Sequence, residues 1–366
     1  MQHHKIPVFI EKIQLNQFRC FDSATIDLNS PMVLIEGNNG SGKTSLLEAL
    51  YYTCYLRSFR THFQKELVHF NENTFFIKVL LRNQENYHNV QVGFSSAKRI
   101  VKIDGKAIAS YKELMDCYRI ISITEDDIEL IKGAPELRRD FLDNALFLMQ
   151  PDYLHKKKKL RKIVENRNNL LRRFETFDPQ MYRLWTEQLW QISIDVQQER
   201  MKLLSALALE TNSLLKTHVD GSIQLKLTYR NKNMFGFENF DEFWLKAQEF
   251  APQERMFKRS IFGAQLDDFE ILFQGIHART YSSRGQQKLI LFLMKIALLK
   301  LTSTTYGSAI LLIDDFMTDF DQQRLGWLVS LLVSTKNQLI FTCPLTPSAL
   351  RTVLSPHNPL VVKLTA

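Results

Sequence analysis

The sequence predicts an α/β protein with a covered parallel sheet, a mixed β layer beside it and a mainly helical second lobe. Three observations predict this class. Short apolar runs alternate with helical stretches near both ends, a glycine-rich turn joins one run to a helix, and residues 135–215 are glycine-free with helical periodicity. We expect three segments: an N-terminal β-rich part (1–134), a helical lobe (135–256) and a C-terminal α/β part (257–366).

The glycine-rich turn fits the pattern G-x-x-x-x-G-K-[ST]. The apolar run Met32–Ile35 precedes it, and the helix-forming run Ser45–Tyr51 follows. Such a turn points backbone N–H groups at a phosphate, and the helix N-terminus adds positive potential. We expect Lys43 to reach the β- and γ-phosphates of ATP or GTP, and Thr44 to ligate Mg²⁺. The predicted nucleotide-binding residues here are Gly37, Asn38, Asn39, Gly40, Ser41, Gly42, Lys43, Thr44 and Ser45.

Short strand-like runs follow the first helix and predict the β layer. They are Phe75–Leu80, Val90–Phe94 and Ile100–Ile103, and the last ends in the hairpin-turn dipeptide Asp104-Gly105. We expect this layer to lie against the sheet that carries the glycine-rich turn.

Two long helices are predicted in the second segment, with a break near Phe177-Asp178-Pro179. Apolar residues recur at spacings of three and four, which suits an antiparallel hairpin or short coiled coil. An ordinary helical subdomain is equally consistent with the pattern.

A second half of the nucleotide site is predicted late in the chain. The apolar strand Ala309–Ile313 ends in Asp314-Asp315. We expect Asp314 to hold Mg²⁺ through water and Asp315 to polarise the attacking water. The carboxyl ends of parallel strands meet at one sheet edge, which is where ligands bind.

A Ser-x-Gly-Gln element opens the helix that precedes this strand. Ser283 is a suitable N-cap, and Gly285 and Gln286 follow in the first turn. A helix N-terminus of this kind binds phosphate, although a capping turn alone also explains the pattern. The element lies in the sequence between the glycine-rich turn (Walker A) and Asp314-Asp315 (Walker B), which is the order found in the dimeric ABC-class ATPases. There, the signature serves nucleotide held by the other protomer.

The formal charge of +8 and the pI of about 9.2 permit polyanion binding without requiring it. The densest basic run contains Lys156, Lys157, Lys158 and Lys159 and continues to Arg167, Arg172 and Arg173. It predicts either a solvated helix face or an arm that touches a DNA backbone. Arg57 and Arg60, after the first helix, are candidates for phosphate or DNA contact, and Arg19 is a candidate near the nucleotide. A structural salt bridge is the alternative for each of these arginines.

The remaining composition narrows the class of protein. No apolar run reaches transmembrane length, and the first residues are not those of a signal peptide. The four cysteines form no C-x-x-C pair, so neither a disulfide framework nor a zinc site is expected. These features predict a cytoplasmic protein without membrane contact.

The chain resembles the RecF family over nearly its whole length. The resemblance rests on the opening strand around Phe18-Arg19, the P-loop helix followed by Arg57-Ser58-Phe59-Arg60, and the stretch Glu125–Asp143. Arg167-Asn168 on the first long helix, the Ser283 signature and the Asp-Asp Walker B complete it. Three positions depart from the family pattern. Gly263-Ala264-Gln265-Leu266 stands in place of the usual Gly-Pro-His-Arg, and Arg284 stands in place of the glutamine before the signature's glycine. In Thr318-Asp319-Phe320-Asp321, which fits the loop that lines the dimer interface (the seam loop), Phe320 replaces the usual leucine, so the chain resembles a divergent member.

The resemblance implies an ABC/SMC-type ATPase head that uses ATP and Mg²⁺ and hydrolyses ATP slowly. It further implies an ATP-dependent homodimer on duplex, gapped or junction DNA, which helps to load recombinase with RecR- and RecO-like partner proteins. The shorter side chain of Asp315, in place of the glutamate of transport ATPases, also predicts slow turnover, with ATP as a dimerisation switch.

Three rival functions remain open at this point. A transport ATPase would lack the long basic helical insertion and would usually carry Leu-Ser-Gly-Gly-Gln. An ATPase of a nuclease or phage-defence system would usually carry, or sit beside, an acidic nuclease domain. A non-catalytic scaffold that only holds nucleotide is separated from an enzyme by an ATPase assay.

Overall fold

A computed structural model describes residues 8–83, 86–95, 98–108, 110–172, 178–219, 222–234, 236–345 and 349–364. The chain divides into two compact units, one made of residues 1–127 with 298–366 and one made of residues 128–297. The first unit therefore uses both ends of the sequence, as the split arrangement of the motifs predicts.

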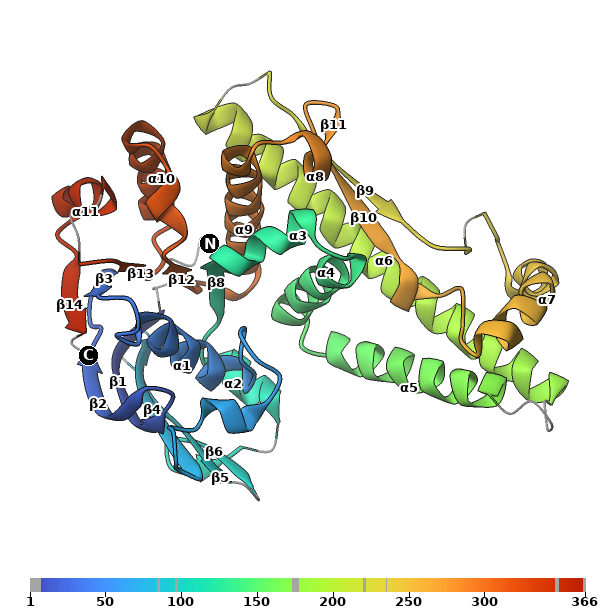
Figure 1. The fold of residues 1–366 in the computed structure, drawn as a ribbon, viewed down its shortest axis with the longest axis horizontal. Coiled ribbons are helices and arrows are strands. Elements are labelled where there is room, and N and C mark those ends of the chain that lie inside the picture. The colour runs from blue at the N-terminus through green and yellow to red at the C-terminus, as the bar shows by residue number, and fades with distance from the viewer. Residues whose placement is uncertain are drawn as a thin grey trace. The chain divides into compact units, whose positions relative to one another are not determined.

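A parallel sheet lies at the centre of the first unit (Figure 1). Its strands stand in the order β14 (Leu360–Leu364), β3 (Met32–Gly37), β13 (Leu339–Cys343), β12 (Ile310–Asp314) and β8 (Ile120–Thr124). Every residue of β3, β12 and β13 is buried, which explains their apolar, non-alternating sequences. The predicted parallel, covered sheet is confirmed.

The predicted β layer is an antiparallel sheet in the same unit. Its order is β2 (Phe21–Asp27), β1 (Val8–Phe18), β4 (Thr74–Asn83), β5 (Asn86–Ser95), β6 (Arg99–Ile103) and β7 (Lys106–Ala107). Asp104 and Gly105 both have positive φ, as a tight hairpin turn between β6 and β7 requires.

Helix α1 (Lys43–Tyr55) contacts strands of both sheets, and it is buried along most of its length. The unit also contains α2 (Tyr111–Cys117), α10 (Gln322–Ser334) and α11 (Ala349–Leu354), with short 3₁₀ turns at Gln64–Leu67, Phe316–Asp319 and Ser355–His357. The sequence predicts the strand, the turn and the helix around the glycine-rich segment, but it does not predict that α1 contacts both sheets.

The second unit is mainly helical. Its long members are α4 (Pro135–Met149), α5 (Tyr153–Arg172), α6 (Pro179–His218) and α7 (Phe240–Phe257). Its short ones are α3 (Glu129–Lys132), α8 (Ala278–Tyr281) and the 3₁₀ turn Ala264–Leu266, while the 3₁₀ turn Glu125–Ile128 crosses the division after residue 127. Helices α5 and α6 pack on each other, so the predicted pair of long helices is confirmed. Asp178 caps α6 by accepting from the N–H groups of Gln180 and Met181, while Phe177 and Arg173 lie outside the described residues.

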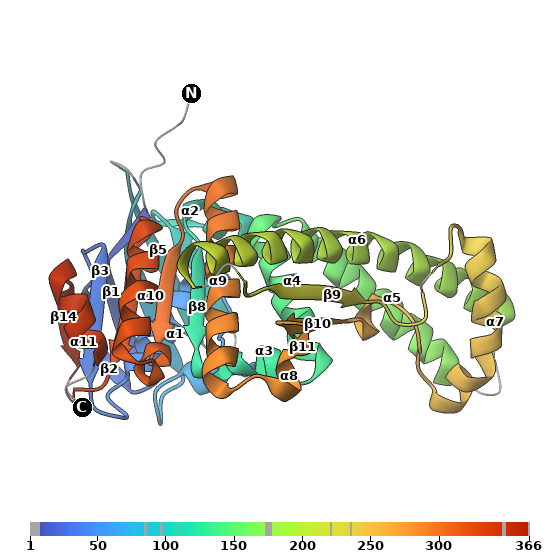
Figure 2. The ribbon, with the colours of Figure 1, turned by 90° about the horizontal axis from the view of Figure 1, so that it is seen from above.

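A small antiparallel sheet runs beside α6 in this unit (Figure 2). Its order is β11 (Ile276–His277), β10 (Asp268–Phe273) and β9 (Leu225–Arg230). The predicted boundary at residue 257 is therefore wrong. Because β10 pairs with β9, residues 257–297 fold with the helical unit rather than with the nucleotide-binding one.

Helix α9 (Arg284–Tyr306) begins in the second unit and ends in the first. Among the described residues it is the one helix long and apolar enough to cross a membrane, with a mean hydropathy of 1.5, and 67% of that window is buried. Such burial is that of a core helix.

Candidate nucleotide-binding site

The glycine-rich turn joins β3 to α1, as predicted. Gly40 and Gly42 have φ of 86° and 96°, a left-handed conformation in which a side chain is strained. A Cβ atom on Gly42 would also lie 2.7 Å from Cys20 Sγ and 2.7 Å from the Phe21 ring. Position 42 therefore requires glycine, because the backbone is left-handed there and because Cys20 and Phe21 leave no room for a Cβ atom.

The Lys43 ammonium lies within this turn. It donates to the carbonyl oxygens of Gly37 at 3.0 Å and Asn38 at 3.3 Å, and the residue is 5% exposed. One Asp315 carboxylate oxygen lies 3.9 Å away. The cation is thus held at the start of α1, where the unpaired N–H groups of a helix attract anions.

The parallel register brings the two predicted half-sites together. Strand β13 pairs with β3 on one side and with β12 on the other, so the carboxyl ends of all three meet at one edge. The Thr44 hydroxyl, on α1, hydrogen-bonds to the Asp314 carboxylate at the end of β12. Burial raises the pKa of Asp314, although hydrogen bonds from Thr44 and Thr342 oppose this.

Thr342 is a site residue that the motifs do not identify. Its hydroxyl lies 2.9 Å from Asp314 Oδ1 and 3.2 Å from Asp315 Oδ1, and it accepts from the Asp315 N–H at 2.8 Å. The signal was available, because the apolar run that forms β13 ends at the sheet edge shared by β3 and β12.

Asp315 has a left-handed backbone, with φ of 48° and ψ of 2°. This conformation costs a residue with a side chain about 1–2 kcal/mol. The hydrogen bonds to Thr342 hold Asp315 in this conformation, which keeps its carboxylate near Lys43.

Oxygen donors of this kind fit Mg²⁺. The described residues contain no group of three or more His, Cys, Asp and Glu side chains that would hold a metal alone. Mg²⁺ at nucleotide sites usually takes one or two protein oxygens together with phosphates and water. Thr44 and Asp314 supply that set.

The three candidate arginines near the turn take part in other contacts. Arg19 donates two hydrogen bonds, of 2.8 and 2.7 Å, to the carboxylate of Glu48, a fully buried residue of α1. Arg60 lies 3.5 Å from the same carboxylate, and Ser58 donates to it. The Arg57 guanidinium lies 5.6 Å from the centre of the Tyr55 ring. For Arg19 and Arg60 the structure contains the salt bridge that the sequence left as the alternative.

The Ser283 element forms a reciprocal cap at the start of α9. The Gln286 N–H donates to Ser283 Oγ at 3.2 Å, and the Ser283 N–H donates to the Gln286 side chain at 2.8 Å. The predicted N-cap is confirmed. This element belongs to the second unit, whereas the P-loop belongs to the first. The side chains of Thr318 and Asp319, in the predicted seam loop, lie outside the described atoms.

The divergent turn Gly263–Leu266 is held within the second unit. Arg200 donates to the Ala264 carbonyl at 2.7 Å, and the Ala264 N–H donates to Ser193 at 3.1 Å. Gln265, where the family has histidine, donates to the Phe262 carbonyl at 2.7 Å. Here the turn serves the packing of α6.

The basic run on α5 separates into two groups. Lys156 pairs with Glu199, and Lys157 lies 3.0 Å from Asp140 and 3.2 Å from Asp143. Lys158 and Lys159 are exposed, and no carboxylate of the described residues is within ion-pair distance of them. Lys158 and Lys159 therefore remain the exposed candidates for DNA contact in this run.

Arg167 does not belong to a solvated face. Both it and Glu254 are fully buried, and two hydrogen bonds of 2.7 and 2.6 Å join them. The guanidinium lies 4.8 Å from the Tyr182 ring centre and 4.5 Å from that of Phe262. Arg167 is therefore a core residue of the second unit.

Comparisons with known proteins agree with this geometry. A family model described as an AAA domain matches residues 12–270. The chain is 30% identical over 334 residues to the "DNA replication and repair protein RecF" of Acholeplasma laidlawii, covering 91% of this chain and 92% of that protein. The protein of the same name from Streptococcus pyogenes is 27% identical over 338 residues, covering 92% of each.

Solved structures give the same fold. The structure described as "the recombination mediator protein RecF-ATPrS in RecFOR pathway" matches with a TM-score of 0.82 and 24% identity over 94% of both chains. The Smc head domain with an extended coiled coil from Pyrococcus furiosus matches with a TM-score of 0.55 and 15% identity, covering 97% of this chain and 93% of that one. The predicted ABC/SMC-type head is confirmed.

Proposed function

The chain belongs to the RecF family of DNA replication and repair proteins, and on this premise we propose that it is a slow, Mg²⁺-dependent ATPase of recombinational repair. It binds duplex or gapped DNA in the cytoplasm as an ATP-dependent dimer. One similar structure is described as that of a recombination mediator protein in the RecFOR pathway. We extend this to RecR- and RecO-like partners for the present chain.

One observation carries the ATPase proposal. Lys43, Thr44 and the two aspartates converge at one sheet edge, and Thr342 joins the aspartates. In this proposal the turn's N–H groups bind phosphates and Lys43 neutralises them. Thr44 and Asp314 would hold Mg²⁺, which would supply positive charge beside the phosphates. Asp315 accepts a hydrogen bond from the attacking water.

Slow hydrolysis has a structural reason in the same cluster. The Asp315 carboxylate already accepts a hydrogen bond from the Thr342 hydroxyl at 3.2 Å, and it lies 3.9 Å from the Lys43 ammonium. A carboxylate shared among these contacts is less free to turn toward the attacking water. This supports ATP as a switch for association.

The dimer is proposed from the Ser283 element. Ser283, Gly285 and Gln286 form a capped helix start whose first N–H groups attract phosphate. In the proposed dimer, this start meets the γ-phosphate held by the partner protomer. Lys158 and Lys159 are the proposed DNA contacts on α5, and they would read backbone phosphates without sequence preference.

The test combines ATPase assays with sedimentation. We expect Asp315→Asn to lower steady-state turnover by about 100-fold while ATP still binds and still promotes dimerisation. Asp195→Asn, an exposed change on α6, is the matched control and should leave turnover unchanged. Equal turnover in Asp315→Asn would show that the assigned residue is wrong. A protein that stays monomeric with ATP and does not bind duplex or gapped DNA would refute the proposed DNA-binding dimer.

A further inference from the structure

The antiparallel sheet of the first unit has two different faces. On β4, Phe75, Ile77 and Val79 are buried toward α1, and Phe76 and Lys78 alternate with them on the opposite face. That opposite face is largely open to solvent, and it carries an aromatic ring and basic side chains.

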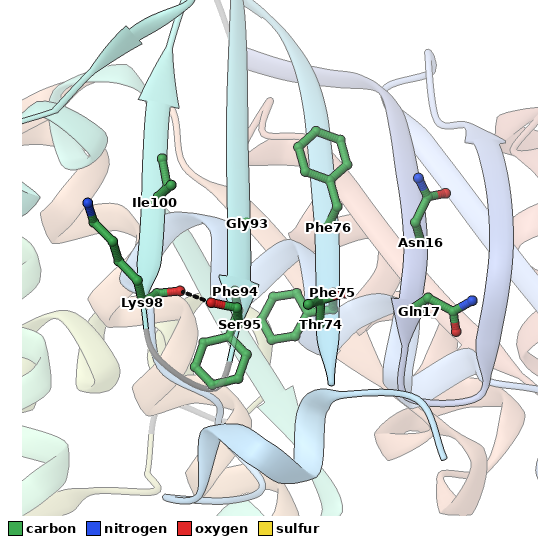
Figure 3. A pocket seen from close by; sticks show the side chains of 10 residues that line it. All are labelled: Asn16, Gln17, Thr74, Phe75, Phe76, Gly93, Phe94, Ser95, Lys98 and Ile100. Carbon is green, nitrogen blue, oxygen red and sulfur yellow. Dashed lines mark hydrogen bonds between the residues drawn. The ribbon is translucent and has the colours of Figure 1, made fainter. Parts of the chain in front are cut away.

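A hollow of about 350 Å³ lies on this face (Figure 3). Gly93 of β5 pairs with Phe76 on one side and with Ile100 of β6 on the other. A Cβ atom added to Gly93 would meet nothing within 4 Å, so the space between the two apolar side chains is free. Ile100 is 47% exposed, and the Phe76 ring is half-buried. The space above the Gly93 backbone thus lies between an aromatic and an aliphatic side chain, and Phe75 and Phe94 also line the hollow.

Unpaired positive charge surrounds the hollow. Lys78 and Lys102 both pair in register with Gln91, which lies two residues along β5 from Gly93, and Lys98 lines the hollow itself. Among the described residues, no carboxylate lies within ion-pair distance of these three lysines.

The acidic residues on the same face are already compensated. Glu11 lies 3.1 Å from Arg82, and Asp27 stands opposite Lys12 in the register of β1 and β2. The local potential around the hollow is therefore positive, and a partner must bring negative charge beside a flat apolar group.

We propose that this face binds single-stranded DNA. One base lies over Gly93 against the Phe76 ring, and the adjoining phosphates contact Lys78, Lys98 and Lys102. The combination of a stacking ring and basic side chains on a sheet face suits an unpaired strand. A duplex keeps its bases stacked inside and offers nothing to Phe76. An added peptide strand would need a free sheet edge rather than this face.

The site extends the proposed function to a second DNA contact, and it does not depend on the nucleotide site. Its test measures the affinity of the full-length protein for a fluorescein-labelled 12-residue oligothymidylate by anisotropy. We expect Phe76→Ala to weaken binding by about tenfold or more, because one stacked base is lost. We expect Gly93→Val to do the same by filling the hollow. Gly93 does not have a left-handed backbone, and valine suits a strand, so this variant should fold.

The lysines are tested by the salt dependence of binding. Lys78→Gln should reduce the slope of log K against log salt by about 0.7. Lys226→Gln, an exposed lysine of β9 in the other unit, is the matched control and should change the oligothymidylate affinity much less. Duplex binding and ATPase activity, measured on the same preparations, should be unchanged in Phe76→Ala and Gly93→Val.

Two results would overturn the proposal. In the first, the lysine variants weaken binding but Phe76→Ala and Gly93→Val do not, so no base stacks there. In the second, none of the variants changes the affinity for oligothymidylate. Either result leaves the proposed ATPase function intact, since that function is measured by turnover.

Discussion

Replacing Arg167 is expected to destabilise the protein strongly without acting on DNA. The Arg167 and Glu254 side chains are both 0% exposed, and Tyr182 donates a further hydrogen bond of 2.7 Å to the same carboxylate. Arg167→Met would leave the Glu254 charge buried without its cation. Breaking a buried pair in this way costs about 3–5 kcal/mol. That is a large share of the about 5–15 kcal/mol by which a domain is stable.

Urea unfolding followed by circular dichroism measures this loss. Because the chain has two units, we expect the transition of the second unit to move to lower urea while that of the first moves less. The double variant Arg167→Met with Glu254→Gln should recover part of the loss, since no unpaired charge remains. A loss below about 1 kcal/mol, or a DNA defect at full stability, would refute this account of Arg167.

Lys159→Gln, on the same helix, tests the proposed contact between α5 and DNA. Lys159 is exposed, so its replacement should leave the free energy of unfolding unchanged and lower the affinity for duplex DNA modestly. The two variants thus separate the structural part of the basic run from the part that we propose contacts phosphate.

Three further predictions concern the nucleotide site. Thr342→Val should lower ATP turnover by about tenfold, since hydrogen bonds to charged groups contribute about 1.5–3 kcal/mol. N-Ethylmaleimide should block nucleotide binding through Cys20, which is exposed beside Gly42, whereas burial raises the pKa of Cys117 to about 11 and slows its reaction. Asp314→Asn should stabilise the nucleotide-free protein at pH 7.5, because burial raises the pKa of Asp314 and so disfavours its charge in the fold. This gain should shrink once the pH falls below the raised pKa, where the folded wild-type carboxyl becomes neutral, and vanish near the ordinary pKa of an aspartate, where the unfolded carboxyl is neutral too.

Each of these has a direct control. Thr352→Val, an exposed threonine of α11, should keep wild-type turnover. Cys20→Ser should bind nucleotide after the reagent treatment, and continued inhibition of that variant would contradict the assignment. Urea unfolding of Asp314→Asn at pH 7.5 that shows a loss of stability would mean that the charged carboxylate is favoured in the fold.

The sequence predicts most of the first unit because its signals are local. Apolar runs such as Met32–Ile35 end at turns whose residue types specify the backbone, and Asp104-Gly105 marks a hairpin within four residues. Parallel strands then place Asp314 beside the P-loop through a general rule of sheet edges. Thr342 follows from the same rule, although no motif contains it.

The second unit was predicted less completely because its decisive contacts are distant in sequence. Strand β9 pairs with β10 about 40 residues later, and no local pattern specifies that partner. Arg167 lies in a basic run, which suggests an exposed side chain. It is buried because it pairs with Glu254, which belongs to another helix. Arg19 and Arg60 likewise form ion pairs with Glu48. The burial of Glu48 could not be predicted, because it results from the packing of α1 against both sheets.

The position of β3 has a consequence for the order in which the protein forms. Its neighbours, β13 and β14, are encoded about 300 residues after it, while the whole second unit lies between them. A nascent chain leaves the ribosome from its N-terminus, so the helical unit is complete before the P-loop strand has any partner in its sheet. Until then β3 and the turn at Gly37–Thr44 present an unpaired apolar strand. The nucleotide site is therefore among the last parts to assemble, because a chain that ends before β12 and β13 lacks Asp314, Asp315 and Thr342.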